Sequence, residues 1–121
     1  MRKYKFRAFI PSPPPGRWDG HGPLMRYSDE FIEVGEFFTK MLNHQIFFEV
    51  YIMEWTGLKD IKGTDIYEAD LVDIDFEYKG RMLLNKEVVF KHGMFGVEEG
   101  IFIGLDGYRV TVSGNKYEVL K

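Results

Sequence analysis

The stretch VDIDFEYKG at residues 72–80 decides the fold class of this chain, because apolar and charged side chains alternate along it without interruption. A period of two places the apolar side chains on one face of a β-strand and the charged ones on the other. Gly80 at its end is typical of a turn. The stretch therefore predicts a strand with one buried face, followed by a turn back into the next strand.

Short apolar segments separated by turn residues continue from this stretch to the end of the chain. Further strands are expected over residues 87–91 and 100–105, and a hairpin is expected where a type I′ turn signal lies between apolar segments. The expected turns are Gly93, Gly96, Asp106-Gly107 and Ser113-Gly114-Asn115. This spacing predicts a mainly β fold, in which residues 55–121 form a small SH3-like or otherwise rolled β-barrel.

The N-terminal half is expected to pack one strand and one short helix on that barrel. Residues 3–9 alternate between cationic and apolar side chains and predict a half-buried strand, and the proline-rich residues 11–23 predict a surface loop. Residues 28–43 place apolar side chains at helical spacing and favour a short helix capped by Ser28, although an internal glycine and β-branched residues leave a strand open. Residues 46–55 predict a buried strand.

The composition limits the class of protein. A length of 121 residues suits one domain over residues 1–121, and 45% hydrophobic with 17% aromatic residues excludes a disordered chain. No apolar run is long enough to span a membrane and no signal peptide is recognisable, so a soluble cytoplasmic protein is expected. The lack of cysteine excludes disulfides and thiolate chemistry, and the net charge of −3 argues against binding nucleic acid by bulk electrostatics.

Three patches of the chain match one known family. One is Lys5-Phe6-Arg7-Ala8-Phe9 near the start, and another is Gly114-Asn115-Lys116-Tyr117-Glu118 near the end. The central patch is the most specific and consists of Trp55, Thr56, Gly57, Leu58, Lys59, Asp60, Gly63, Ile66, Tyr67, Glu68, Asp70 and Val72. With these patches the chain resembles the YopX family, small proteins encoded by bacteriophages and prophages.

The resemblance implies a mostly β, YopX-like fold and a phage or prophage origin, and with it the cytoplasm of a bacterial host. It implies no mechanism. The chain departs from the family pattern at Ala69, where glycine is usual, and at Phe9, where tryptophan is usual. Glycine accepts a positive φ without cost, so the alanine argues against a positive φ at that position.

The charged face of the strand at residues 72–80 is a candidate for binding a basic partner. This acidic face consists of Asp73, Asp75 and Glu77. Alternate strand residues lie about 6.5–7 Å apart, which is too far for three carboxylates to converge on one metal ion without help from a neighbouring strand. A solvated sheet face is therefore the plainer interpretation.

No other group of residues predicts a catalytic or metal site. Asp60 to Glu68 loosely resembles a calcium loop, but its spacing fails, and the segment is interpreted as a turn with Ile61 and Ile66 buried. The three histidines, His21, His44 and His92, lie far apart in the sequence. We therefore expect no enzyme, no catalytic residue, no cofactor and no metal.

The favoured function is a non-enzymatic accessory protein of a phage or prophage that binds another protein. The alternative is a nucleic-acid-associated module in phage replication or gene control, using the cations and aromatic residues of 3–9. A homo-oligomer stays open, and no membrane partner is expected. The basic face of the first strand, Lys3, Lys5 and Arg7, is expected to lie near the acidic face, because like charges at alternate positions repel unless opposite charge is close.

Overall fold

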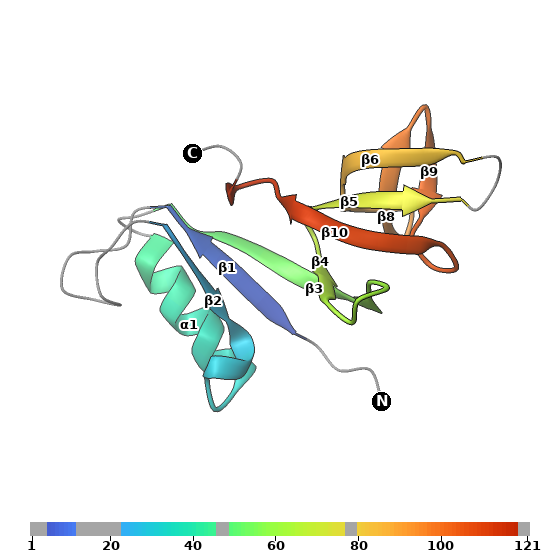
Figure 1. Cartoon of the computed structure of the whole chain (residues 1–121). Coiled ribbons are helices and arrows are strands. Elements are labelled where there is room, and N and C mark those ends of the chain that lie inside the picture. The colour runs from blue at the N-terminus through green and yellow to red at the C-terminus, as the bar shows by residue number, and fades with distance from the viewer. Residues whose placement is uncertain (1–4, 12–22, 46–48, 77–79, 119–121) are drawn as a thin grey trace. The chain divides into compact units, whose positions relative to one another are not determined.

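The computed structural model describes residues 5–11, 23–45, 49–76 and 80–118 of the chain (Figure 1). It divides the chain into two compact units, Met1–Glu54 and Trp55–Lys121. Each unit has its own buried cluster of apolar side chains. The expected proline-rich loop falls almost wholly on residues 12–22, which lie outside the described residues.

The first unit is an antiparallel sheet with one α-helix along a face of it. Its elements are β1 (Phe6–Ile10), β2 (Leu24–Tyr27), a short 3-10 helix η2 (Ser28–Glu30), α1 (Val34–Gln45) and the first residues of β3 (Tyr51–Lys59). β1 is the middle strand and pairs with β2 on one side and β3 on the other. Phe37 and Met41, four residues apart on α1, are fully buried together with Ala8 and Ile10 of β1.

Both faces of β1 are buried, whereas its alternating sequence predicts one buried and one solvated face. Ala8 and Ile10 belong to the cluster under α1. Arg7 and Phe9 point to the other face, yet Arg7 is only 7% exposed and Phe9 only 4%. The solvated face expected for this strand is therefore wrong at Arg7, which is not on an open surface. Residues 3 and 4 of the expected strand lie outside the described residues.

The helix begins later and the following strand begins later than the sequence predicts. Ser28 does not cap α1, because its Oγ accepts a hydrogen bond of 3.0 Å from the N–H of Phe6 and the helix starts six residues further on. α1 then continues to Gln45, and residues 46–48 of the expected strand lie outside the described residues. The strand starts at Tyr51 and runs on to Lys59.

The second unit consists of short antiparallel strands around one apolar cluster. Its strands are β4 (Asp65–Tyr67), β5 (Asp70–Asp75), β6 (Met82–Glu87), β7 (Val89–Lys91), β8 (Met94–Glu99), β9 (Ile101–Gly104) and β10 (Arg109–Asn115). They form the sheets β10-β5-β6 and β7-β8-β9, and the last residues of β3 pair with β4. The buried cluster includes Ile66, Val72, Ile74, Val88, Phe95, Val97, Leu105 and Val110. This architecture confirms the prediction of a mainly β fold with a small, rolled, barrel-like C-terminal half.

Two of the expected turns lie inside strands. Gly96 is in the middle of β8, opposite Gly104 of β9, and a Cβ there would lie 2.2 Å from the carbonyl oxygen of Ile103. Glycine is needed at position 96 for this close approach of two strands and not for a turn. Gly114 lies in β10, where the register against β5 shifts between Val112 and Gly114, so the expected turn is a β-bulge.

Two other strand predictions are wrong in their connections. Asp106-Gly107 does not close a hairpin, because β9 before it pairs with β8 and β10 after it pairs with β5. It turns the chain from one sheet to the other, with Gly107 at a φ of +91°. The strand expected over residues 87–91 is divided at Val88 between the end of β6 and β7.

Candidate functional site

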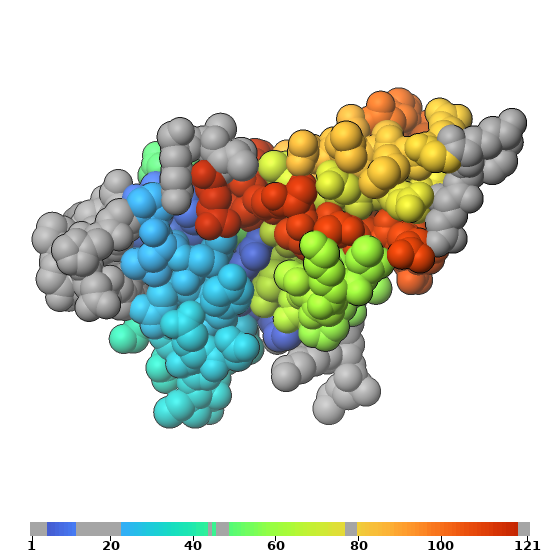
Figure 2. Space-filling model, viewed as in Figure 1, coloured from blue at the N-terminus to red at the C-terminus, as the bar shows by residue number. Residues whose placement is uncertain are grey.

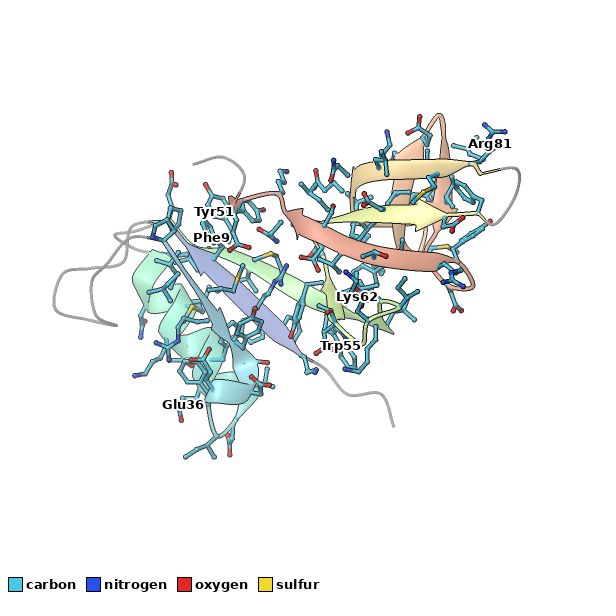
Figure 3. All side chains as sticks on the ribbon, in the orientation of Figure 1. Phe9, Glu36, Tyr51, Trp55, Lys62 and Arg81 are labelled. Atoms are coloured by element: carbon cyan, nitrogen blue, oxygen red, sulfur yellow. The ribbon has the colours of Figure 1, made fainter. Side chains whose placement is uncertain are left out.

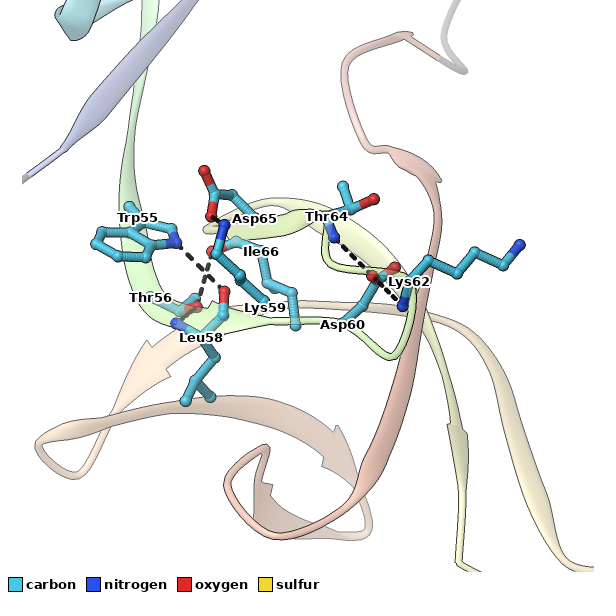
Figure 4. A network of polar contacts seen from close by, with 9 residues as sticks. All are labelled: Trp55, Thr56, Leu58, Lys59, Asp60, Lys62, Thr64, Asp65 and Ile66. Carbon is cyan, nitrogen blue, oxygen red and sulfur yellow. Dashed lines mark hydrogen bonds and ion pairs between the residues drawn. The ribbon is translucent and has the colours of Figure 1, made fainter.

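The family-like segment that starts at Trp55 uses its polar groups to hold β3 against β4 (Figure 4). The Thr56 hydroxyl donates a hydrogen bond of 2.7 Å to the carbonyl of Ile66 and accepts one of 3.1 Å from the N–H of Leu58. The Trp55 indole N–H donates to the carbonyl of Leu58 at 3.2 Å. These bonds lie where the register of β3 against β4 shifts between Trp55 and Lys59, and Gly57 there has a φ of +87°. The segment therefore fixes a bulged strand.

Asp60, at the end of β3, is a buried carboxylate that accepts three backbone hydrogen bonds. Its Oδ1 accepts from the N–H groups of Lys62 and Thr64, and its Oδ2 accepts from the N–H of Val112 on β10, each at 2.9 Å. Burial alone would raise the pKa of this carboxyl, but the hydrogen bonds from Val112, Thr64 and Lys62, with the charge of Lys62, hold the pKa below its usual value. The carboxylate therefore closes the turn after β3 and joins this turn to β10.

Of the two isoleucines expected to be buried in this turn segment, one is exposed. Ile66 is buried in the apolar cluster as expected, but Ile61 is 55% exposed. Its backbone N–H donates to the carbonyl of Val110, while its side chain points outward from the turn between Asp60 and Gly63. The oxygen atoms of this segment do not form a calcium loop, because Asp60 is engaged by backbone N–H groups.

Asp70 and Asn115 join the central family-like patch to the closing one. Asp70 Oδ2 accepts a hydrogen bond of 2.8 Å from the N–H of Tyr67, and Asn115 Nδ2 lies 3.4 Å from Asp70 Oδ1. The two residues are direct partners in the register of β5 and β10, and both are buried. The two patches are 45 residues apart in sequence at this pair, and they meet in the fold through this contact.

Ala69 has a φ of +70°, so the positive φ is present although glycine is not. The expectation drawn from the alanine is wrong. The backbone at this position is fixed on both sides, because the Ala69 N–H donates to the carbonyl of Val88 and the Ala69 carbonyl accepts from the N–H of Lys116. These two bonds hold a conformation that costs an alanine roughly 1–2 kcal/mol.

The acidic face lies within the sheet β10-β5-β6 and contacts its own neighbours. Asp73 Oδ1 accepts a hydrogen bond of 2.8 Å from the N–H of Asn85, and Asp75 stands opposite Arg109 of β10 in the strand register. Glu77 lies outside the described residues. Since both described carboxylates are half-buried in the middle strand of a sheet, they offer a partner less surface than the sequence predicts.

The described residues bring no catalytic or metal-binding group together. His21 lies outside them, and nothing is described of the His44 side chain. His92 is at a turn with a φ of +54°, and its ring lies 5.7 Å from that of Phe102. Among the described residues there is no group of three histidine, aspartate or glutamate side chains placed to hold a metal ion.

An open cavity of about 340 Å³ lies between β6 and β9 in the second unit. Of the described side chains that line it, five are apolar and two are charged: Phe76, Arg81, Met82, Leu83, Glu99, Ile101 and Ile103. Met82 is 50% exposed and Ile101 is 70% exposed, so the apolar lining reaches the surface. In the space-filling view, β6 in gold lies at the surface of this unit (Figure 2). Sequence reasoning missed this surface because it did not predict β6.

The fold and the site define a small, mainly β protein whose family-like polar residues are used to hold its own turns. A model of the YopX protein family matches residues 20–119, and the chain belongs to this family. No helix in the part of the chain that the structure describes has the length and apolar character needed to cross a membrane.

Two further comparisons add little to this assignment. Among solved structures, the crystal structure of protein EF1440 from Enterococcus faecalis is similar over 100% of both chains, with 19% sequence identity and a TM-score of 0.46. No curated protein sequence matches the chain.

Proposed function

We propose that this chain is a non-enzymatic accessory protein of a phage or prophage, and that it acts by binding another protein in the bacterial host cell. The observation that carries the proposal is the apolar surface of the second unit, which surrounds the cavity between two strands. The exposed apolar side chains that line this cavity are Met82 and Ile101. Contiguous exposed apolar surface with polar groups at its margin is typical of protein interaction sites.

The chemistry of the family-like residues supports binding over catalysis. Asp60, Asp70 and Thr56 are buried, and their oxygen atoms are engaged by backbone N–H groups or by the backbone carbonyl of Ile66. A catalytic carboxylate or hydroxyl has to reach its substrate. These three side chains instead stabilise the fold of the second unit. We therefore assign the function to the apolar surface at the cavity of that unit.

The alternative of a nucleic-acid module has less support in the described residues. Base stacking needs exposed aromatic rings beside exposed cations. On β1, Arg7 and Phe9 are buried, and Phe6 packs against the ring of Phe38 with centroids 4.8 Å apart. The strand that carries the alternative therefore presents no stacking surface at these three positions.

Affinity capture of the tagged full-length protein from induced lysogenic cells tests the proposal. The sample is divided, and one half is treated with nuclease before capture. We expect one protein to be retained in comparable amount in both halves, and to bind again when it is purified and mixed with this chain. A partner lost on nuclease treatment, together with binding of a fluorescent oligothymidylate that weakens steeply with salt, would overturn the proposal in favour of a nucleic-acid module.

A further inference from the structure

We propose that the partner is held as an extended segment between the edge strands β6 and β9, with an apolar side chain in the cavity and a carboxylate beside Arg81. This inference rests on the proposed function and adds the place of binding and the chemistry of the bound segment. It depends on three observations: the cavity, the open strand edges, and a cation, Arg81, with no ion pair to another described residue.

The cavity has the size and lining of a site for side chains. Its volume of about 340 Å³ lies at the lower end of the range of roughly 300–1,000 Å³ found for ligand pockets. Phe76, Leu83 and Ile103 line it and pack against the buried cluster of the unit. Met82 and Ile101 line it from the two strands and are half exposed or more. Covering them with an apolar side chain would remove apolar surface from water.

Among the strands that the structure describes, β6 and β9 beside the cavity each have a sheet neighbour on one side only. In the sheets of the structure, β6 pairs with β5 and β9 pairs with β8, each at the edge of its sheet. The outer edge of β10 is different, because the turn after β3 covers it: the Ile61 N–H donates to the carbonyl of Val110. An open edge presents backbone N–H and C=O groups to which an extended peptide can add as a strand.

The charges at the cavity favour a negative group on the bound segment. Glu99 is paired with Lys86 of β6. Arg81 is exposed, and no ion pair to it is present among the described residues (Figure 3). Among the described residues that line the cavity, the carboxylate of Glu99 is therefore paired and the guanidinium of Arg81 is not. A guanidinium binds a carboxylate well through its planar fork of donors.

Selection from a phage-displayed library of random twelve-residue peptides on the immobilised full-length protein tests this site. We expect enriched peptides to share apolar residues at alternate positions with a neighbouring aspartate or glutamate. The most enriched peptide is then synthesised with a fluorescent label and its affinity measured by polarisation. Ile101→Asp should weaken binding by at least about tenfold, and Arg81→Gln by about fivefold to tenfold.

Two matched variants serve as controls. Ile61→Asp makes the same substitution at an exposed isoleucine of the turn after β3 that does not line the cavity, and Lys91→Gln removes an exposed cation elsewhere in the unit. Both should change the affinity by less than about twofold. Unchanged circular dichroism and melting temperature show that each variant is folded, which is expected because the substituted side chains are exposed.

Other results would overturn the inference. One is the absence of any shared motif, and another is an equal loss of binding in Ile61→Asp and Ile101→Asp. A third is a dimer in sedimentation equilibrium that Ile101→Asp dissociates, because the site would then bind a second copy of the chain. Tight binding of free indole-3-propionate without binding of any peptide would mean that the cavity binds a small apolar anion and not a peptide. If Ile101→Asp captures the same cellular protein as the wild type, protein binding stands and this site is wrong. If neither captures a protein, the proposed function itself is wrong.

Discussion

At the scale of single residues, Asp60 shows how one carboxylate can hold segments that are far apart in the sequence. It bonds the N–H groups of its own turn and that of Val112, which is 52 residues away along the chain. Hydrogen bonds to an ionised acceptor are stronger than those between neutral groups. The side chain therefore stabilises the junction of the turn with β10, and its removal should be felt in the whole second unit.

We expect Asp60→Asn to lower the free energy of unfolding at pH 7 by about 1–3 kcal/mol. The amide oxygen can still accept from Lys62 and Thr64, but the amide nitrogen is a donor and leaves the Val112 N–H without an acceptor. Urea denaturation followed by circular dichroism measures the loss. An equal loss in the control Asp65→Asn, whose side chain makes an ion pair with the exposed Lys59, would contradict the role assigned to Asp60.

The pH dependence of stability gives a second check on Asp60. Because the pKa of its carboxyl in the folded protein is below the usual value of 3.8, the ionised form stabilises the fold above about pH 4. That contribution is lost as the pH falls through the folded-state pKa. The free energies of unfolding of the wild type and of Asp60→Asn should therefore differ at pH 7 and approach one another below about pH 4. A difference that does not change with pH would contradict the lowered pKa.

Ala69 is a position where two substitutions test the backbone conformation. Ala69→Gly relieves a positive φ that costs about 1–2 kcal/mol, but loses a buried methyl group worth about 0.8 kcal/mol and about 0.4–1 kcal/mol of unfolded-state entropy, so the free energy of unfolding should change by less than about 1 kcal/mol. Ala69→Val should instead destabilise by about 1–3 kcal/mol, because a β-branched residue is strained at positive φ. Thermal denaturation of both variants measures the effects, and a glycine variant that is less stable than the valine variant would be the contrary result.

At the scale of elements, the pairing of β8 with β9 depends on the absence of a side chain at position 96. Gly96→Ala would place a Cβ 2.2 Å from the Ile103 carbonyl oxygen, so we expect a loss of about 1–3 kcal/mol or more in the free energy of unfolding. Gly35→Ala is the matched control, because Gly35 lies in α1 with nothing near its missing Cβ. It should gain about 0.4–1 kcal/mol. Equal effects of the two substitutions in urea denaturation would contradict the close approach.

The sequence predicts elements well where the side-chain period is undisturbed and poorly where a bulge shifts it. β5 follows its alternation, with Val72 and Ile74 buried and Asp73 and Asp75 half-buried. β6 does not alternate, because Leu84 and Asn85 together stand opposite one residue of β5 and Asn85 has a φ of +53°. A bulge changes which face each later residue takes, and no period of two then survives in the sequence.

Strand pairing is the part of the fold that local sequence could not supply. The Asp106-Gly107 signal correctly predicts a turn but wrongly predicts a hairpin. The strands on its two sides pair with other strands, β9 with β8 and β10 with β5. The candidate site has the same origin. Met82 and Ile101 come from the edges of two different sheets, and only the fold brings them to one cavity.

At the scale of the whole molecule, β3 belongs to both units. Tyr51 to Glu54 pair with β1 in the first unit, and Trp55 and Lys59 pair with β4 in the second. The sequence-based prediction adds an electrostatic link between the units, from the basic face to the acidic face. Within the strand registers, however, β1 has both neighbours in the first unit and β5 has both neighbours in the second. The register of each strand is thus fixed inside its own unit, and the link stays a prediction that needs its own test.

Double-mutant cycles on Asp75 provide that test. Asp75 stands opposite Arg109 in the register of β5 and β10, so Asp75→Lys places two cations opposite each other and should cost about 0.5–1 kcal/mol. Adding Arg109→Glu should restore part of this loss, and the sequence-based prediction requires that Lys5→Glu does so too. Urea denaturation of the single and double variants gives the coupling energy of each pair. If Asp75 couples to Arg109 and not to Lys5, the negative charge of Asp75 is compensated within the second unit, which would contradict the sequence-based prediction. Additive losses in both cycles would return Asp75 to the candidates for binding a basic partner.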